Sequence, residues 1–414
     1  MSIQNQCNLF LWLILFVSAT EVVAQAPQDP QIVSSGFGEN VSTGCPRLQV
    51  IDNMLYAPGP DGIKRHSKGN TASWEPYAMQ GVNVIDFRIY DEDIIAVIIP
   101  EEFSQSSDMD LRTVARLVKG KVTGSSFVDI TPKKMEYIYH GEILTCLSAI
   151  AQHPGYRERV MTMGHGGIFQ SKDFGETWEK ISDYRATYNQ HSFLGWHPQH
   201  PEIMYLTSES AFFVGIVYRS TDGGKTWESF EPDPYSESSC HYIAFDPDDV
   251  NHLLISGEYK IYESFDCGET WMTVFEDHNN DKPILGYAYN IIYDPKDTTN
   301  STVYAVGHAN GSTARNVVRS TDKGKTWQQC MTYDYGDDHN FFYDSTLFDG
   351  KIWIYDCKDI VYWNIDGSSG TEPIVFDNIQ SATYYDLNGI RLNSRPASGI
   401  VIKKNGESTK KIVL

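Results

Sequence analysis

Ser220-Thr-Asp222-Gly-Gly224-Lys-Thr226-Trp227 is one of four closely similar octapeptides in this chain. The other three begin at Ser171, Ser264 and Ser320, and all four fit the pattern S-x-D-x-G-x-T-W. Their tryptophans are 49, 44 and 56 residues apart. Repeats at such a period, separated by strand-like sequence, are typical of β-propellers. The octapeptides therefore predict an all-β fold built from similar units.

Each octapeptide lies inside a longer unit with the same order of apolar segments. A first apolar segment ends in His-Pro or Asp-Pro, at 153–154, 197–198, 246–247 and 294–295. A second apolar segment follows, a third leads into the octapeptide, and a fourth begins after its tryptophan. Proline after the first segment fits the end of a strand. Four short strands separated by turn residues make one propeller blade.

The residue types of the octapeptide are those of a tight turn. Aspartate accepts hydrogen bonds from backbone amides further along the turn, and glycine adopts backbone angles that other residues avoid. Serine and threonine hydroxyls can add bonds, and the tryptophan can pack between blades. We therefore assign structural roles, and no catalytic role, to Asp173, Trp178, Asp222, Trp227, Asp266, Trp271, Asp322 and Trp327.

Degenerate units flank the four clear ones. Residues 62–74 keep the serine and tryptophan of the octapeptide, residues 83–130 contain four strand-like segments without it, and residues 342–378 repeat the strand pattern. The equivalent positions would be Trp74, Phe127, Trp178, Trp227, Trp271, Trp327 and Val375. This alignment predicts a single propeller of seven four-stranded blades, with six or eight as alternatives. Ring closure would remove free sheet edges.

The composition changes at both ends of the predicted propeller, which we place at residues 45–380. Residues 9–19 (LFLWLILFVSA) have the length of a signal-peptide core and Val22-Val23-Ala24 offers a cleavage site, so we expect a signal peptide at 1–24. An uncleaved anchor is the alternative. Residues 25–44 form a polar linker, which could also supply a closing strand. We expect a secreted, periplasmic or cell-surface protein without a transmembrane segment after cleavage.

The net charge is −21. Such a charge argues against binding to nucleic acid or to anionic membranes by bulk electrostatics. We expect a monomer. Six cysteines remain after Cys7, and export would permit disulfides between them. Buried free thiols are an equally good interpretation, and the absence of C-x-x-C spacing argues against a zinc site.

Over residues 45–380 the repeat resembles the Asp-box (BNR) superfamily. That superfamily includes sialidases, xyloglucan-hydrolysing glycosidases, sortilin-type receptors and a photosystem assembly factor. The resemblance implies a propeller but does not fix an activity. Arg88 lies in Asp86-Phe-Arg88-Ile, which resembles the first arginine motif of sialidases, but Tyr90 replaces the proline of that motif and no arginine triad is evident. Xyloglucanases of this kind use two tandem propellers, and this chain has room for one.

Residues 381–414 have a different character. Tyr385-Asp-Leu-Asn-Gly389, the segment Gly399–Ile402 and a lysine-rich end resemble the C-terminal sorting segment of secreted proteins from Bacteroidetes. The resemblance implies sorting or surface attachment. A small β-structure appended to the propeller is the alternative interpretation.

Residues that enter the innermost strand of each blade should line the mouth of the central channel. From these positions we take His191, His241, His339, Tyr289, Glu142 and Asp338 as candidate catalytic residues, and His140 and Tyr287 as candidate substrate-binding residues. Arg88, from the sialidase-like motif, is a further candidate substrate-binding residue. Such side chains could bind a divalent metal or act as acid and base. Two carboxylates about 5–10 Å apart could hydrolyse a glycosidic bond. A polar channel mouth without function is the alternative.

Two functions fit these observations. The first is a carbohydrate-active enzyme, a glycoside hydrolase or polysaccharide lyase, acting on a polysaccharide or a glycoprotein glycan at the channel mouth. It requires His191, His241 and His339 to lie within about 10 Å of one another. The second is a propeller that binds glycans or proteins without catalysis.

Overall fold

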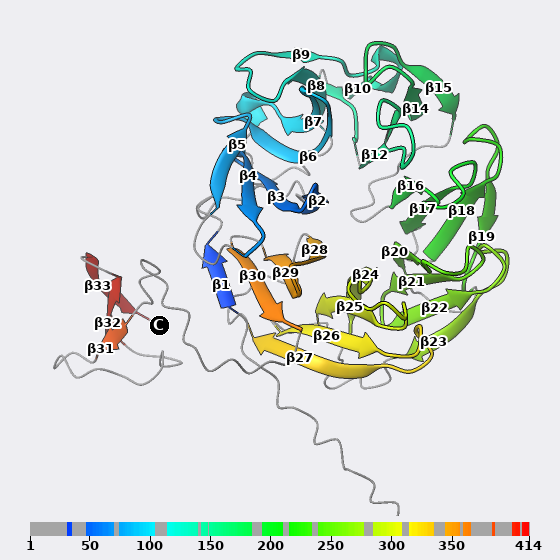
Figure 1. Cartoon of the computed structure of the whole chain (residues 1–414). Helices are drawn as coiled ribbons and strands as arrows, with labels where there is room; N and C mark the ends of the chain where they lie inside the picture. Colours follow the sequence, from blue (N-terminus) through cyan, green and yellow to red (C-terminus); the bar gives the residue numbers. More distant parts are fainter. Residues whose placement is uncertain are drawn as a thin grey trace, which may run out of the picture.

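The computed structural model shows a seven-bladed β-propeller (Figure 1). The structure describes residues 31–34, 47–69, 74–103, 114–139, 142–147, 149–183, 193–209, 215–233, 239–276, 285–308, 314–334, 344–356, 359–365, 383–385, 400–405 and 408–413. Within these ranges the structure has no α-helix, and the short 3₁₀ turns include η1 (Glu101–Phe103) and η3 (Lys133–Met135). The expectation of an all-β propeller with seven four-stranded blades is confirmed.

Six blades are formed by strands that are consecutive in sequence, from the innermost to the outermost. The first two blades are β2 (Gln49–Ile51), β3 (Met54–Gly59), β4 (Gly62–Ser67) and β5 (Glu75–Ala78), then β6 (Asn83–Tyr90), β7 (Asp93–Ile99), β8 (Arg116–Lys121) and β9 (Phe127–Asp129). The third and fourth are β12 (Ala149–Gln152), β13 (Val160–Gly164), β14 (Gly167–Ser171) and β15 (Glu179–Ser182), then β16 (Leu194–Trp196), β17 (Met204–Glu209), β18 (Gly215–Ser220) and β19 (Glu228–Phe230). The fifth and sixth are β20 (Cys240–Phe245), β21 (Leu253–Gly257), β22 (Lys260–Ser264) and β23 (Met272–Glu276), then β24 (Tyr287–Tyr293), β25 (Val303–His308), β26 (Ala314–Ser320) and β27 (Gln328–Asp334).

The seventh blade closes the ring with strands from both ends of the propeller. It consists of β28 (Asp344–Phe348), β29 (Lys351–Asp356), β30 (Asp359–Asn364) and the N-terminal strand β1 (Gln31–Ser34). β1 runs antiparallel to β30, with Gln31 opposite Tyr362 and Ser34 opposite Asp359. The equivalence of Val375 with an outermost strand is therefore corrected: Val375 lies outside the described residues, and β1 occupies the place beside β30. A strand from the opposite end ties the two ends of the ring together.

Alternate residues of each middle strand pack against different neighbouring blades. In β7, Ile94 and Ala96 join the apolar cluster shared with the first blade, which includes Tyr56. Ile95 and Val97 join the cluster shared with the third blade, which includes Ile150 and Val160. Because side chains alternate across a strand, a sheet buried on both faces needs a continuous apolar run, and β7 (DIIAVII) supplies one.

The four octapeptides form the turns between the third and fourth strands of the third to sixth blades. In the fourth blade Ser220 Oγ accepts the N–H of Gly224 at 2.8 Å and donates to Asp222 Oδ1 at 2.8 Å. The N–H and hydroxyl of Thr226 donate to Asp222 at 2.9 and 2.7 Å, and these bonds hold the pKa of Asp222 below its usual range. Trp227 Nε1 donates to Gly224 O at 2.9 Å. These hydrogen bonds within the turn explain the structural role that we assign to the octapeptide.

Two further sheets lie outside the seven blades. A hairpin of β10 (Tyr137–Tyr139) and β11 (Glu142–Leu144) follows the second blade. β31 (Thr383–Tyr385), β32 (Ile400–Asn405) and β33 (Ser408–Val413) form a three-stranded sheet in the segment predicted as a sorting tail. The predicted signal peptide at 1–24 lies outside the described residues, and among those that are described no helix could cross a membrane. Cys146, Cys240, Cys267 and Cys330 are free thiols.

Candidate functional site

For most of the predicted channel-mouth residues, the structure does not describe the position of the side chain. His140, His191, Asp338 and His339 lie outside the described residues, so the expected cluster of three histidines stays a prediction. The backbones of Tyr287 and Tyr289 lie on the inner strand β24, as expected. Glu142 begins β11, which belongs to the extra hairpin and not to an inner strand.

His241 is buried on the inner strand β20, with 2% of its surface exposed. Its Nδ1 lies 2.9 Å from the carbonyl oxygen of Ala288 on β24, so Nδ1 carries a proton and donates it. Burial lowers the pKa of His241 to about 4. The imidazole is therefore neutral at physiological pH and links the fifth blade to the sixth.

Arg88 lies on the inner strand β6 and is held by protein groups. Nη1 forms an ion pair of 2.6 Å with Asp86 Oδ1 and donates to Phe87 O at 2.5 Å. Nη2 donates to the carbonyl oxygen of Ile150 on β12, the inner strand of the third blade. The guanidinium thus connects two inner strands.

A pocket of about 290 Å³ extends along the inner strands β20, β24 and β28, and we call it the axial pocket. Its lining combines three aromatic residues with an amide, a carboxyl and aliphatic groups. The lining residues are Leu48, Pro198, Tyr242, Ile243, Ala244, Phe245, Asn290, Ile291, Ile292, Tyr293, Asp344, Ser345 and Thr346. This mixture of apolar walls and few polar groups is typical of small-molecule sites.

Asp344 is the carboxyl group of the axial pocket. Its Oδ2 accepts the backbone N–H of Leu48 at 2.9 Å, and its Oδ1 accepts Asn290 Nδ2 at 3.2 Å. Burial raises the pKa of Asp344 to about 7, although Arg47 nearby acts in the opposite direction. Near neutral pH this carboxyl therefore exists in both protonation states, and it can donate or accept a proton.

A second carboxyl, Asp86, lies on the other side of β2. Gln49 Nε2 donates to Asp86 Oδ1 at 2.8 Å, while the adjacent residue Leu48 binds Asp344. Asp86 Oδ2 is buried and has no hydrogen-bond partner, and the same is true of Ser345 Oγ in the axial pocket. Buried polar atoms without partners are uncommon in proteins, and they provide unused hydrogen-bonding capacity at the centre of the ring.

Tyr242 completes the polar part of the axial pocket. Burial, and next the negative charge of Asp344, raises the pKa of its hydroxyl. The phenol therefore stays protonated and can donate a hydrogen bond.

In the part of the chain that the structure describes, no three His, Cys, Asp or Glu side chains come together to hold a metal ion.

Sequence reasoning missed Asp344, Asn290 and Tyr242, although it placed the site in the channel. Each of them lies on an inner strand: Tyr242 is the third residue of β20, Asn290 the fourth of β24 and Asp344 the first of β28. The signal that was available is this position, because polar residues stand there within otherwise apolar strands. The histidines of the preceding loops were the more conspicuous feature.

A family model for sortilin, described as "Sortilin, neurotensin receptor 3", matches residues 166–316 and 215–351. Xyloglucanase Xgh74A of Acetivibrio thermocellus is 28% identical over 197 residues, which cover 39% of this chain and 23% of that protein. This chain spans about a quarter of the length of the curated xyloglucanases that it matches.

Two solved structures show the same fold. The GH74 enzyme of Niastella koreensis superposes with a TM-score of 0.59 at 14% identity, covering 94% of this chain and 60% of that one. A structure of YCF48 bound to D1 peptide superposes with a TM-score of 0.55 at 15% identity, covering 84% of this chain and 98% of that one.

Proposed function

Because this chain is a β-propeller of the Sortilin-Vps10/BNR type, related to GH74 xyloglucanases and to sortilin, we propose that it acts on glycans in the axial pocket. The pocket, with its ionisable carboxyl, is the observation that carries this proposal. We further propose that the protein works outside the cytoplasm, at the cell surface or in secreted form, on a polysaccharide or a glycoprotein glycan.

The chemistry of the pocket suits a sugar. Aromatic rings such as those of Tyr242 and Phe245 present apolar faces on which a sugar ring can pack, and Tyr242 adds a hydroxyl donor. The carboxyl group of Asp344 can bind a sugar hydroxyl, and Asn290 holds that carboxyl in place. A volume of about 290 Å³ is at the small end of ligand sites, which favours recognition of one end of a chain or of one side-chain sugar.

A pKa of about 7 suits Asp344 to general-acid catalysis of glycoside hydrolysis. As a protonated acid it would give its proton to the leaving oxygen of the glycosidic bond. Asp86 is the second carboxylate of the channel, and the ion pair with Arg88 keeps a positive charge beside it. Asp86 does not line the axial pocket, so we propose Asp344 as the acid and leave the second carboxylate of such a reaction unassigned.

Binding without catalysis is the second candidate function. One observation favours it: the propeller covers almost all of the YCF48 chain, whose structure contains a bound peptide, but only 60% of the GH74 enzyme. A single propeller is thus sufficient for ligand binding in a protein of similar fold. The ligand would be a glycan or a protein segment that enters the same pocket.

One experiment separates these functions. The purified full chain is screened against plant and host glycans for binding and for release of products. We expect at least one glycan to bind. Asp344→Asn should raise the Kd for that glycan, or lower the rate of its hydrolysis, at least tenfold. Asp183→Asn is the control, because Asp183 is 94% exposed outside the channel. Binding without products would support the second function, and the absence of any glycan binding would contradict the first.

A further inference from the structure

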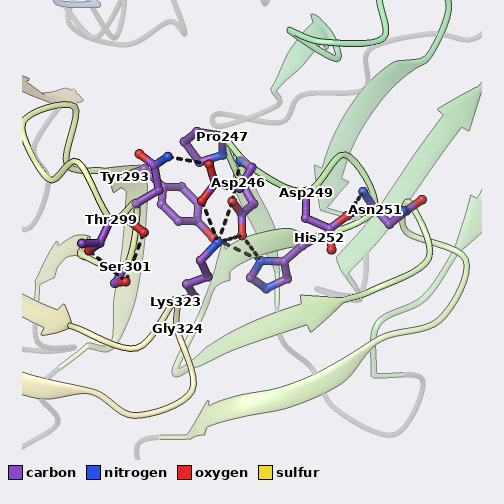
Figure 2. A network of polar contacts seen from close by, with 12 residues as sticks. Asp246, Pro247, Asp249, Asn251, His252, Tyr293, Thr299, Ser301, Lys323 and Gly324 are labelled. Carbon is purple, nitrogen blue, oxygen red and sulfur yellow. Dashed lines mark hydrogen bonds and ion pairs between the residues drawn. The ribbon is translucent and has the colours of Figure 1, made fainter.

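The turn between β20 and β21, residues 246–252, contains a buried ionic cluster at the junction of the fifth and sixth blades (Figure 2). The imidazole of His252 stands between two carboxylates. Its Nδ1 lies 2.8 Å from Asp246 Oδ2, and its Nε2 lies 2.8 Å from Glu263 Oε1 on β22. All three side chains are less than 5% exposed.

This geometry defines the protonation state of His252. Each ring nitrogen faces a carboxylate oxygen, which can only accept, so both nitrogens must carry protons and the ring is an imidazolium. Burial alone would lower the pKa of His252, but the hydrogen bonds that it donates to Glu263 and Asp246 outweigh this effect, and the pKa is raised. Phe265 stacks on the ring at 4.8 Å with an interplanar angle of 10°.

Other charged groups face the cluster from the sixth blade and from the turn itself. Lys323, in the octapeptide turn of the sixth blade, lies 3.0 Å from Asp246 Oδ2 and 3.1 Å from Asp248 Oδ2. Asp249 belongs to the same turn. The hydroxyl of Tyr293, at the end of β24, is 3.3 Å from His252 Nδ1. Figure 2 shows Tyr293, Lys323 and His252 converging on Asp246.

The cluster is directly connected to the axial pocket. Tyr293 is one of the lining residues, and Asp246 follows Phe245, which is another. The fourth blade also contacts this turn, because His197 Nε2 lies 3.1 Å from Val250 O. The next residue, Pro198, lines the axial pocket. His252 therefore contacts both Asp246, directly after the end of β20, and Tyr293, the last residue of β24, which lines the pocket.

We propose that His252 is a positioning residue for the axial pocket: as an imidazolium it fixes the Asp246 turn and the hydroxyl of Tyr293, and loss of its proton loosens this side of the pocket. A neutral imidazole has one protonated nitrogen, so its other nitrogen would present a lone pair to a carboxylate. One of the two contacts of 2.8 Å would then become repulsive. The link to ligand affinity rests on the proposed function, but the link between His252 and Tyr293 does not.

The direct test is a pH titration of the full chain by NMR, with ¹³C-labelled histidine and tyrosine rings. Spectra of His252→Gln and Tyr293→Phe identify the two signals. We expect His252 to titrate above the ordinary histidine pKa of about 6.5 and the Tyr293 signal to move with the same midpoint. A Tyr293 signal that stays constant through the titration of His252 would overturn the proposal, as would a midpoint of His252 at or below 6.5.

Two variants make the test specific. Glu263→Gln keeps an acceptor for Nε2 but removes a negative charge, so we expect both midpoints to shift together to lower pH by about one unit or more. His200→Gln is the matched control, because His200 forms an exposed 2.8 Å pair with Glu202. It should leave both signals unchanged, and independent shifts of the two midpoints in Glu263→Gln would contradict the coupling.

Ligand binding gives the final readout. For a glycan whose binding depends on Asp344, we expect the Kd to rise at least fivefold as pH passes the midpoint of His252, and this step to move to lower pH in Glu263→Gln. A Kd without that step would overturn the role of His252 at the pocket. If no glycan binds, the proposed function fails, while the NMR titration still decides whether His252 controls Tyr293.

Discussion

The backbone N–H of Leu48 donates a 2.9 Å hydrogen bond to Oδ2 of Asp344, across 296 residues of sequence. This bond joins the first blade to the seventh on the channel side, while β1, which precedes the first blade in the sequence, pairs with β30 as the outermost strand of the seventh. The carboxyl that we assign to the functional site thus also belongs to the closure of the ring. Its ionisation should affect both the stability of the protein and its binding of ligand.

Asp344→Asn should change how stability depends on pH. The folded-state pKa of Asp344, about 7, lies above the ordinary value of 3.8, so its contribution to stability is complete below about pH 4 and is lost as pH rises through 7. From pH 5 to pH 8 the wild type should therefore lose about 2–3 kcal/mol relative to Asp344→Asn. Urea unfolding at both pH values measures this difference. Parallel pH dependence of the two proteins would contradict the assignment.

Replacing either of two adjacent glycines in the octapeptide of the fourth blade by alanine should lower the stability of the protein by different amounts. Gly224 has φ +87° and its added Cβ would lie 2.6 Å from Ile181 Cδ1, so Gly224→Ala should cost about 2–3 kcal/mol from strain and overlap. Gly223 has φ +74° with no atom within 4 Å of the added Cβ, so Gly223→Ala should cost about 1 kcal/mol. Denaturant unfolding compares them, and equal costs would show that packing beneath the turn is unimportant.

Removal of β1 should open the ring. A chain that starts at Gly36 lacks Gln31–Ser34 and exposes the edge of β30, whereas a chain that starts at Gln28 keeps the pairing. Because free strand edges associate with one another, we expect the shorter chain to have a lower Tm and to aggregate. Thermal unfolding and size-exclusion chromatography test this. If both chains behave alike, β1 does not close the propeller.

His252→Gln should destabilise the protein most at acidic to neutral pH. Because the folded-state pKa of His252 is raised, its stabilisation is complete below about pH 6.5 and is lost as pH rises through the folded-state value. We expect a loss of about 3 kcal/mol at pH 6, because the buried carboxylates of Glu263 and Asp246 lose the imidazolium and, among the described residues, only Asp246 keeps another cation, Lys323, and a smaller loss at pH 9. His200→Gln, at an exposed pair, should cost under about 0.5 kcal/mol. A loss that grows with pH would contradict the imidazolium.

The parts of the fold that could be predicted are those built from local contacts. In the box that starts at Ser220, each polar contact joins residues two to four positions apart, so the order of residue types was sufficient to identify the turn. The four repeated turns then set the blade period. The closing strand was harder, because Gln31–Ser34 has no octapeptide and its partner β30 is more than 300 residues away.

For the functional site, the sequence predicted a location but not the residues Asp344, Asn290 and Tyr242 that form it in the structure. The sequence predicted it at the mouth of the central channel, and this stays a prediction. Arg88, which was chosen from a sialidase-like motif, lies on the inner strand β6. The choice between neighbouring residues of such a strand depends on register, since a shift of one residue turns every side chain to the other face. Several inner strands contain a bulge or irregularity, as between Val84 and Asp86 on β6 and between Ala288 and Asn290 on β24. Alternation alone therefore could not identify the polar residues of the channel.

The sequence by itself determined that this protein is a propeller of repeated four-stranded blades, because turn chemistry and strand alternation are local properties that recur along the chain; it predicted seven blades but left six or eight open. Only the tertiary structure decided which strand closes the ring, that Asp344 lies beside Leu48 in a pocket with Tyr242, and that His252 stands between two carboxylates. Leu48 and Asp344 belong to the first and seventh blades, so they meet only when the ring has closed. His252 and its two carboxylates lie within the fifth blade, and the sixth blade packs Tyr293 and Lys323 against them.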